Sequence, residues 1–206
     1  MTTRRGLITR IAVPLALLVA MGFGTKVVSS DSAVASGPKA FDPTSYGKTE
    51  FPKLQAAIEK RAVPAATLAS ARAANAADAT KKYGVAGGTG PEFSVSFSGT
   101  VGEGQSGIYR VAVPGTPQAL VIRVQTGPAI NGTDLRDATG EITFGQFTNQ
   151  IEYQNAASAL NNQMKQQVLA PLDTSTLKGK RVDVVGVFQL INPNGWLVTP
   201  TKLSVR

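Results

Sequence analysis

The chain has 206 residues, a formal net charge of +8 at pH 7, and neither cysteine nor histidine. This length suits one domain with an appendage and is enough to bury a core. The lack of cysteine excludes disulfides, thiolate metal sites, a cysteine nucleophile and a lipidated N-terminal cysteine. The lack of histidine excludes the common catalytic triads and most zinc sites. Any catalysis would therefore rest on Asp, Glu, Lys, Ser, Thr or Tyr.

The N-terminus combines basic residues with an apolar run, the layout of a secretory signal or a signal anchor. Three arginines (Arg4, Arg5 and Arg10) flank an apolar run from Ile11 to Gly24. Residues 1–28 therefore predict a membrane anchor, because residues 7–28 have the length of a transmembrane helix. The basic flank predicts that the remaining chain lies outside the cytoplasm. The alternatives are secretion after cleavage near Ala35, where an A-x-A pattern stands, and a buried soluble helix.

Residues 36–206 carry 17 cations and 12 anions, so the exported part is only mildly basic. Nucleic-acid binding requires a dense basic stripe with interleaved aromatic residues, and the sequence has none. We therefore expect no nucleic-acid partner, and a solvated surface that faces anionic lipid or wall polymer.

Two segments precede the main domain. Residues 29–50 are rich in Ser, Gly, Pro and Lys and predict a linker. Residues 51–84 predict a helical hairpin, with a short helix over Pro52–Lys60 and a longer, alanine-rich one over Pro64–Lys82.

From residue 92 the apolar period becomes two, which predicts half-buried strands. Phe93, Val95 and Phe97 alternate with serines. Further strands are predicted at Ile108–Val113, at Leu120–Val124, around Ile142 and Phe144, at Arg181–Ile191 with a bulge at Gly186, and at Trp196–Val205 after an Asn194-Gly195 turn.

One long helix, over residues 149–169, interrupts these strands. Its apolar stripe consists of Tyr153, Ala157, Leu160, Met164 and Val168. Thr148 or Asn149 can cap its start, and its other face is rich in amides. This order predicts an α+β, mostly β, fold over residues 85–206. We expect an OB-like five-stranded barrel with the long helix between strands three and four, and a generic antiparallel α+β sandwich is the alternative.

The densest motif lies in residues 126–161. It reads G-P-x-x-x-G-T-x-L-R-D-A, followed by F-x-x-F-x-N-Q-I-E-Y and then A-L-N. Supporting stretches are Phe41-Asp42-Pro43 with Tyr46, Lys82-Tyr83-Gly84, Leu177-Lys178-Gly179-Lys180 and Val198-Thr199-Pro200. With these motifs the chain resembles, over about residues 25–206, the DUF2291 family of predicted periplasmic lipoproteins of unknown function.

The resemblance implies an extracytoplasmic protein whose gene often lies beside the genes of a sugar ABC transporter. The sequence departs from the family pattern at one point, because Thr25 stands where members carry the lipidated cysteine. Threonine cannot take the thioether-linked lipid, which favours a retained helix as the anchor.

Seven residues are candidates for binding a ligand or a partner: Thr133, Arg136, Asp137, Asn149, Gln150, Asn161 and Trp196. An arginine fork suits carboxylates and carbonyls, amides suit sugar hydroxyls, and an indole can stack on a sugar ring. Neighbours on a strand point to opposite faces, so we expect Arg136 and Asp137 each to hold a turn or a partner. The structural alternatives are a buried pair that fixes a loop, a helix cap and core packing. We expect no catalytic residue, metal or cofactor.

Three functions remain open. The first is a non-enzymatic, membrane-anchored protein that binds another protein, plausibly a sugar ABC transporter component. The second is a module that binds a sugar or carbohydrate polymer directly, through residues 131–137 and Trp196. The third is a hydrolase that uses carboxylates such as Asp134 and Asp137.

Overall fold

The structure is a computed structural model that describes residues 40–206. The predicted anchor over residues 1–28 and the first part of the predicted linker lie outside the described residues. Among the helices of residues 40–206, none combines the length and the apolar character that crossing a bilayer requires. The described chain mixes helices with one seven-stranded sheet.

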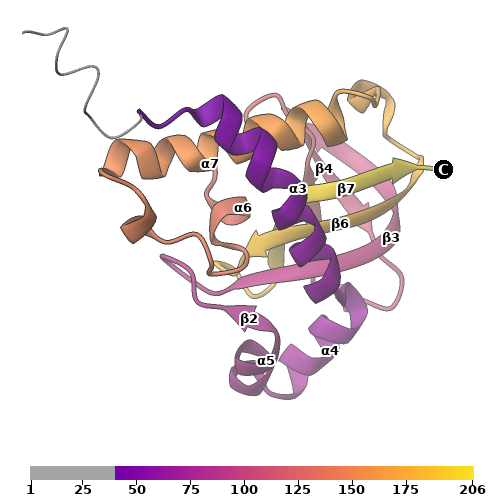
Figure 1. The fold of residues 1–206 in the computed structure, drawn as a ribbon. Coiled ribbons are helices and arrows are strands. Elements are labelled where there is room, and N and C mark those ends of the chain that lie inside the picture. The colour runs from indigo at the N-terminus through magenta and orange to yellow at the C-terminus, as the bar shows by residue number, and fades with distance from the viewer. Residues whose placement is uncertain (1–39) are drawn as a thin grey trace, which may run out of the picture. The chain divides into compact units, whose positions relative to one another are not determined.

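Five of the seven strands pair one after another around a closed circuit, and the other two add to one of them (Figure 1). They are β1 (Val63–Pro64), β2 (Gly84–Val85), β3 (Glu92–Gln105), β4 (Ile108–Ala112), β5 (Val121–Gln125), β6 (Arg181–Gln189) and β7 (Gly195–Val205). Strand β4 lies antiparallel between β3 and β5, and β5 runs parallel to β7. Strand β7 pairs with β6, which pairs along the length of β3 and so completes the circuit. The short strands β1 and β2 add to β3.

Alternating residues of these strands form the core. Phe93, Val95 and Phe97 are buried, as their spacing predicts, and Val111, Ile122 and Val124 join them in the same core cluster. The ring of Trp196 stacks on Phe188, with 4.7 Å between centroids, and Phe188 stacks on Phe93 at 5.6 Å. The ladder is irregular at Gly186, as predicted, but the extra residue lies on the partner strand, because Val185 pairs with Lys202 and Gly186 with Pro200, which leaves Thr201 of β7 as the bulged residue. A Cβ at Gly186 would lie 2.4 Å from the Thr199 carbonyl oxygen, so only glycine fits there.

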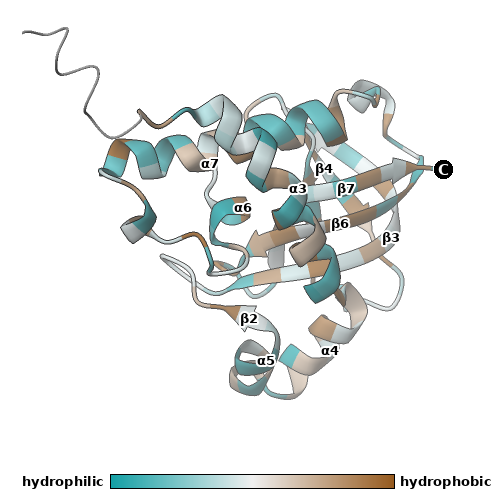
Figure 2. Cartoon of the chain, viewed as in Figure 1, coloured by the Kyte–Doolittle hydropathy of each residue, from teal (hydrophilic) through white to brown (hydrophobic). Residues whose placement is uncertain are grey.

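The predicted long helix is confirmed as α7 (Gln150–Met164), which continues as a π-helical turn, η2 (Lys165–Leu169). The backbone N–H of Glu152 donates to Asn149 Oδ1 at 2.9 Å, and the Glu152 carboxylate accepts from the backbone N–H of Thr148 at 2.9 Å. Asn149 is thus the cap. The predicted stripe faces the core from Ala157 to Val168, while polar residues colour much of the helix in Figure 2.

The predicted linker over residues 29–50 is wrong at its C-terminal end. Helix α3 (Pro43–Arg61) begins at Pro43 rather than Pro52, because Asp42 accepts the N–H of Thr44 as an N-cap and Pro43 fits the first helical turn. Pro52 lies inside the helix. Helix α3 packs against α7 rather than forming a hairpin with the next helix. At Gly47 a Cβ would lie 2.7 Å from the Ala159 carbonyl oxygen of α7, so glycine permits this close packing.

The predicted longer helix of the hairpin is two helices, α4 (Ala65–Ala74) and α5 (Ala76–Tyr83), which pack against each other. Asn75 separates them. Its backbone is extended and its side chain accepts the N–H groups of Ala77 and Asp78, so it caps α5 instead of continuing α4.

The predicted strand around Ile142 and Phe144 is also wrong. The segment forms a 3-10 turn, η1 (Phe144–Gln146), in which the Gln146 side chain accepts from the Thr143 N–H and donates to the Glu141 carbonyl. These local bonds replace the ladder that a strand would need. Two other short elements lie in the connections: α6 (Asp134–Asp137), before η1, and the 3-10 turn η3 (Thr174–Thr176), after α7.

Candidate functional site

The connection between β5 and α7 contains a buried ion pair. Arg136 donates through Nε to Asp137 Oδ1 at 2.8 Å and through Nη2 to Asp137 Oδ2 at 3.0 Å. The two neighbours hold each other, which is the structural alternative of a buried pair in a loop, because they lie in the helical turn α6 rather than on a strand. Both side chains are about nine-tenths buried. A two-pronged pair of this kind has fixed geometry as well as strong hydrogen bonds.

The same guanidinium also joins α6 to α7. The Cζ atom of Arg136 lies 3.7 Å from the ring centroid of Tyr153, and Nη1 donates to the Tyr153 carbonyl at 3.4 Å. A desolvated cation over an aromatic face is attractive, and the planar guanidinium suits this stacking. Arg136 therefore fixes the position of the Tyr153 ring on α7.

Tyr153 belongs to a cluster of contacting rings that we call the aromatic patch: Phe41, Tyr46, Phe144, Phe147 and Tyr153. Each ring lies 5.2–5.8 Å, centroid to centroid, from at least one other, in tilted or edge-to-face orientations. Such orientations are the favourable ones for aromatic pairs. The patch brings together the chain before α3, helix α3 itself, η1, and the first turn of α7.

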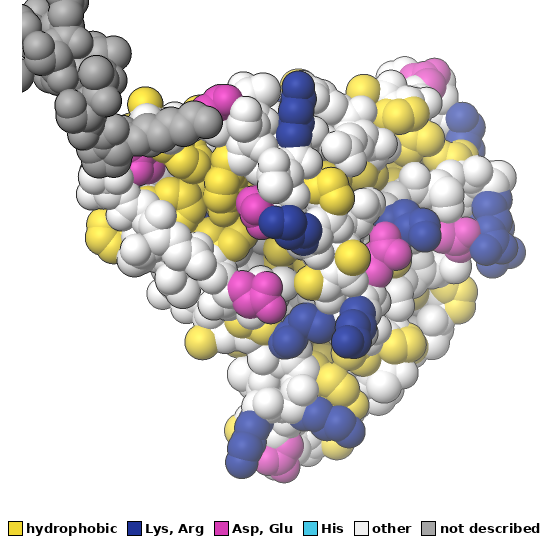
Figure 3. All heavy atoms as spheres, in the orientation of Figure 1, with side chains coloured by type: hydrophobic (Ala, Val, Ile, Leu, Met, Phe, Trp, Pro, Cys, Tyr) yellow, Lys and Arg dark blue, Asp and Glu magenta, His cyan; other side chains and the backbone are white. Residues whose placement is uncertain are grey.

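Part of this patch is open to solvent. Within the patch, Phe144 is 49% exposed. Ile151 is not one of the five rings, but it lies two residues before Tyr153 on the first turn of α7 and is 72% exposed. Hydrophobic side chains gather on the surface between α7 and α6 in Figure 3. Burial raises the pKa of the Tyr46 hydroxyl to about 12, and burial also raises the pKa of Tyr153. Both phenols therefore stay neutral across the physiological pH range, and the patch remains an uncharged apolar surface.

Two more acids lie behind the ion pair. Asp134 Oδ2 accepts from the hydroxyl of Thr199 at 2.8 Å. The hydroxyl oxygen of Thr199 in turn accepts from Gln125 Nε2 at 2.8 Å. Burial raises the pKa of Asp134. Glu92 is fully buried, and its Oε1 accepts from Gln189 at 3.0 Å, whereas Oε2 has no partner among the described residues. Burial, with the nearby charges of Asp134 and Asp137, raises the pKa of Glu92 to about 8.

Sequence reasoning missed Glu92, and its position in the sequence predicts the opposite of what the structure shows. Its position directly before the buried Phe93 places it on the other face of β3, where a solvated side chain would be expected. Both faces of β3 are covered at this point, however, and Ser94 is buried as well.

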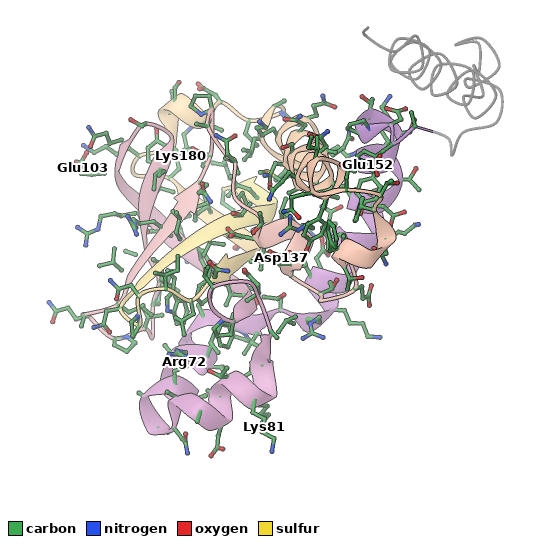
Figure 4. The ribbon with its side chains drawn as sticks, turned by 90° about the vertical axis from the view of Figure 1, so that its left-hand side faces the viewer. Arg72, Lys81, Glu103, Asp137, Glu152 and Lys180 are labelled. Carbon is green, nitrogen blue, oxygen red and sulfur yellow. The ribbon has the colours of Figure 1, made fainter. Side chains whose placement is uncertain are left out.

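The predicted site residues occupy two separate places. Six of them lie in the β5–α7 connection or on α7: Thr133, Arg136, Asp137, Asn149, Gln150 and Asn161. Arg136 and Asp137 support the aromatic patch, whereas Asn149 caps α7 and Gln150 is exposed beside that cap. Asn161 is buried and donates to the Gly132 carbonyl at 2.8 Å, which ties α7 to the turn before the half-buried Thr133. Figure 4 shows Asp137 in the interior and Glu152 near the start of α7.

Trp196 lies apart from these residues. It is 1% exposed and packs in the core against Phe188. Its ring also borders a cavity of about 340 Å³ between α4 and the β6–β7 turn, and its Nε1 has no hydrogen-bond partner among the described residues.

Comparison with known proteins gives the family. The sequence model of DUF2291, described as a predicted periplasmic lipoprotein, matches residues 15–204. The chain belongs to the DUF2291 family. No curated protein matches it.

One solved structure agrees with the fold of this DUF2291 member. It is an OB-fold protein from Thermotoga maritima, with a TM-score of 0.66 and 20% sequence identity. The match covers 82% of this chain and all of the other one. This likeness shows the fold alone. The family description places the protein outside the cytoplasm, in agreement with the basic flank of the N-terminal apolar run.

Proposed function

We propose that the chain is a non-enzymatic, membrane-anchored extracytoplasmic protein whose OB-like five-stranded barrel presents the aromatic patch to another membrane protein. The observation that carries this proposal is the partly exposed cluster of aromatic rings around Tyr153, next to the exposed Ile151. Aromatic residues are enriched in protein interfaces, and tyrosine is enriched among the few residues that dominate the binding energy.

The support beneath the patch favours binding over simple packing. The Arg136 guanidinium lies against the Tyr153 ring, and its Nε and Nη2 atoms donate to the Asp137 carboxylate. The position of the ring is therefore fixed before a partner binds. A preorganised surface loses little side-chain freedom on association. This rigidity supports a specific contact surface.

The position of the patch along the chain favours a partner in the same membrane. Phe41 is part of the patch, and only residues 29–40 separate the predicted membrane segment from it. A twelve-residue linker, as the Ser- and Gly-containing composition predicts, would have a root-mean-square span of about 20 Å if it behaved as a random coil. An anchor at residues 1–28 would therefore keep the patch close to the membrane surface. A component of a sugar ABC transport system is the partner that the family resemblance implies.

A second candidate function, direct sugar binding, is favoured by a different surface. A cavity of about 320 Å³ lies between the start of α3 and the amide-rich face of α7. Its polar lining includes Thr44, Asn155, Ser158, Asn162, Gln163 and Gln166. Amides and hydroxyls can donate to and accept from sugar hydroxyls. A sugar that raises the melting temperature of the purified protein would favour this second function.

The first proposal predicts that Ile151→Asp lowers the recovery of the co-purifying membrane partner by about tenfold or more, because a charge would be buried at the interface. The full-length, C-terminally tagged protein is purified from detergent-solubilised membranes, and the partner is quantified by mass spectrometry.

The matched control is Ile191→Asp, because Ile191 is 79% exposed and lies in the β6–β7 turn, outside the patch. This variant should retain the partner, and both variants should keep the melting temperature of the wild type. Equal recovery with all three proteins would contradict a partner site at the patch.

A further inference from the structure

Two arginines face each other across neighbouring strands on the side of the sheet away from the core. Strands β4 and β5 pair so that Arg110 lies directly opposite Arg123. The residues on either side, Val111, Ile122 and Val124, point into the core, which places both arginines on the outer face. Like charges directly opposite each other destabilise a sheet.

Nothing in residues 40–206 compensates for this repulsion. Neither arginine forms an ion pair or a side-chain hydrogen bond there, and the Nε atom of the half-buried Arg123 is buried without a partner. A buried donor without an acceptor has a desolvation cost that a bound acceptor would remove. The neighbouring acid, Glu103, forms its ion pair with Lys178 rather than with either arginine.

The surface around the pair is hollowed. Two shallow, open depressions of about 670 Å³ each meet here, and Arg110 and Glu103 border both of them. One extends along β4 and β5 toward residues 113–118, and the other is bordered by Arg123, Gln105 and Ser106 at the β3–β4 turn. Space for a ligand therefore exists beside the unpartnered guanidinium.

We infer that Arg110 and Arg123 together bind an oxyanion, the carboxylate or phosphate group of a ligand. Two adjacent guanidinium forks match the several acceptor oxygens of such a group, and a bound anion would offset their repulsion. This site is separate from the aromatic patch. In Figure 4 Glu103, which borders both depressions, lies at the left edge of the domain, whereas Glu152 lies on the right and Asp137 near the centre.

The test measures thermal unfolding of the full-length protein in a neutral detergent at pH 7.5. Inorganic phosphate or succinate replaces chloride at constant ionic strength. Near saturation the wild-type melting temperature should rise by about 4 °C or more. A rise with phosphate alone assigns a phosphate ligand, a rise with succinate alone assigns a carboxylate, and a rise with both assigns the shared oxyanion chemistry.

Arg110→Gln and Arg123→Gln should each abolish this rise. In chloride, Arg110→Gln should melt at or above the wild-type temperature, because the repulsion is relieved. The control Arg61→Gln removes an exposed arginine at the end of α3 and should keep the full rise. The inference is overturned if neither anion stabilises the wild type, or if the two variants respond as the control does.

Discussion

Replacing Arg136 with methionine is expected to lower the free energy of unfolding by about 3–5 kcal/mol, because the change leaves the buried Asp137 carboxylate without its partner. Methionine fills similar space, so the loss comes from the uncompensated charge rather than from a cavity. It would also remove the contact of the guanidinium with the Tyr153 ring, 3.7 Å away. Urea denaturation of the full-length protein in detergent, followed by circular dichroism, measures the change.

The chain offers a matched control in Arg206→Met. Arg206 pairs with Asp183 through Nε at 2.6 Å, but its side chain is 69% exposed. Exposed pairs contribute about 0.2–1 kcal/mol, so this variant should be nearly as stable as the wild type. The double variant Arg136→Met/Asp137→Leu should recover much of the loss, because it leaves no buried charge. Equal, small effects of Arg136→Met and Arg206→Met would contradict the buried pair.

Glu92→Gln is expected to make the protein more stable than the wild type at pH 8.5 and to leave its stability unchanged near pH 4. Burial raises the pKa of Glu92 to about 8 in the folded protein, whereas the unfolded chain has the ordinary value near 4.5. Between these two values the folded state holds a proton that the unfolded state has released. Wild-type stability therefore falls as the pH rises from about 4.5 to 8, by a contribution of about 2–4 kcal/mol.

Glutamine keeps the acceptor for Gln189 and cannot ionise, so this contribution should disappear in the variant. Urea denaturation at several pH values between 4 and 8.5 measures the difference between the two proteins. Glu103→Gln serves as the control. Because Glu103 is exposed, this substitution should change the free energy of unfolding little at any pH in this range. A constant difference between Glu92→Gln and the wild type at every pH would show that Glu92 does not titrate as described.

Where one local pattern dominates, the sequence predicts the structure well. The serine alternation of residues 93–97 places three apolar side chains in the core, and the stripe from Ala157 to Val168 identifies the buried face of α7. Asn149 was identified as one of two caps from its position before that stripe. The order of these elements was also sufficient to predict the OB fold that the Thermotoga maritima protein shares.

The errors occur where distant or side-chain contacts decide the structure. The start of α3 depends on the hydrogen bond from the Thr44 N–H to the Asp42 side chain and on packing against α7. The composition of this segment, by contrast, is typical of a linker. Around Phe144 the side chain of Gln146 stabilises a turn although the apolar spacing indicates a strand. The aromatic patch joins Phe41 to Phe147 across more than a hundred residues, and no spacing rule reveals such a contact.

The most direct test of partner binding at the aromatic patch is site-specific photo-crosslinking in intact membranes. The photoreactive residue p-benzoylphenylalanine replaces Phe144, which is partly exposed within the patch, or Ile191 as the control position outside it. We predict one discrete adduct with a membrane protein when the probe is at position 144. This adduct should be absent when the probe is at position 191, and it should be lost when the probe at position 144 is combined with Ile151→Asp. The absence of an adduct at position 144, or the same adducts from both positions, would contradict the account.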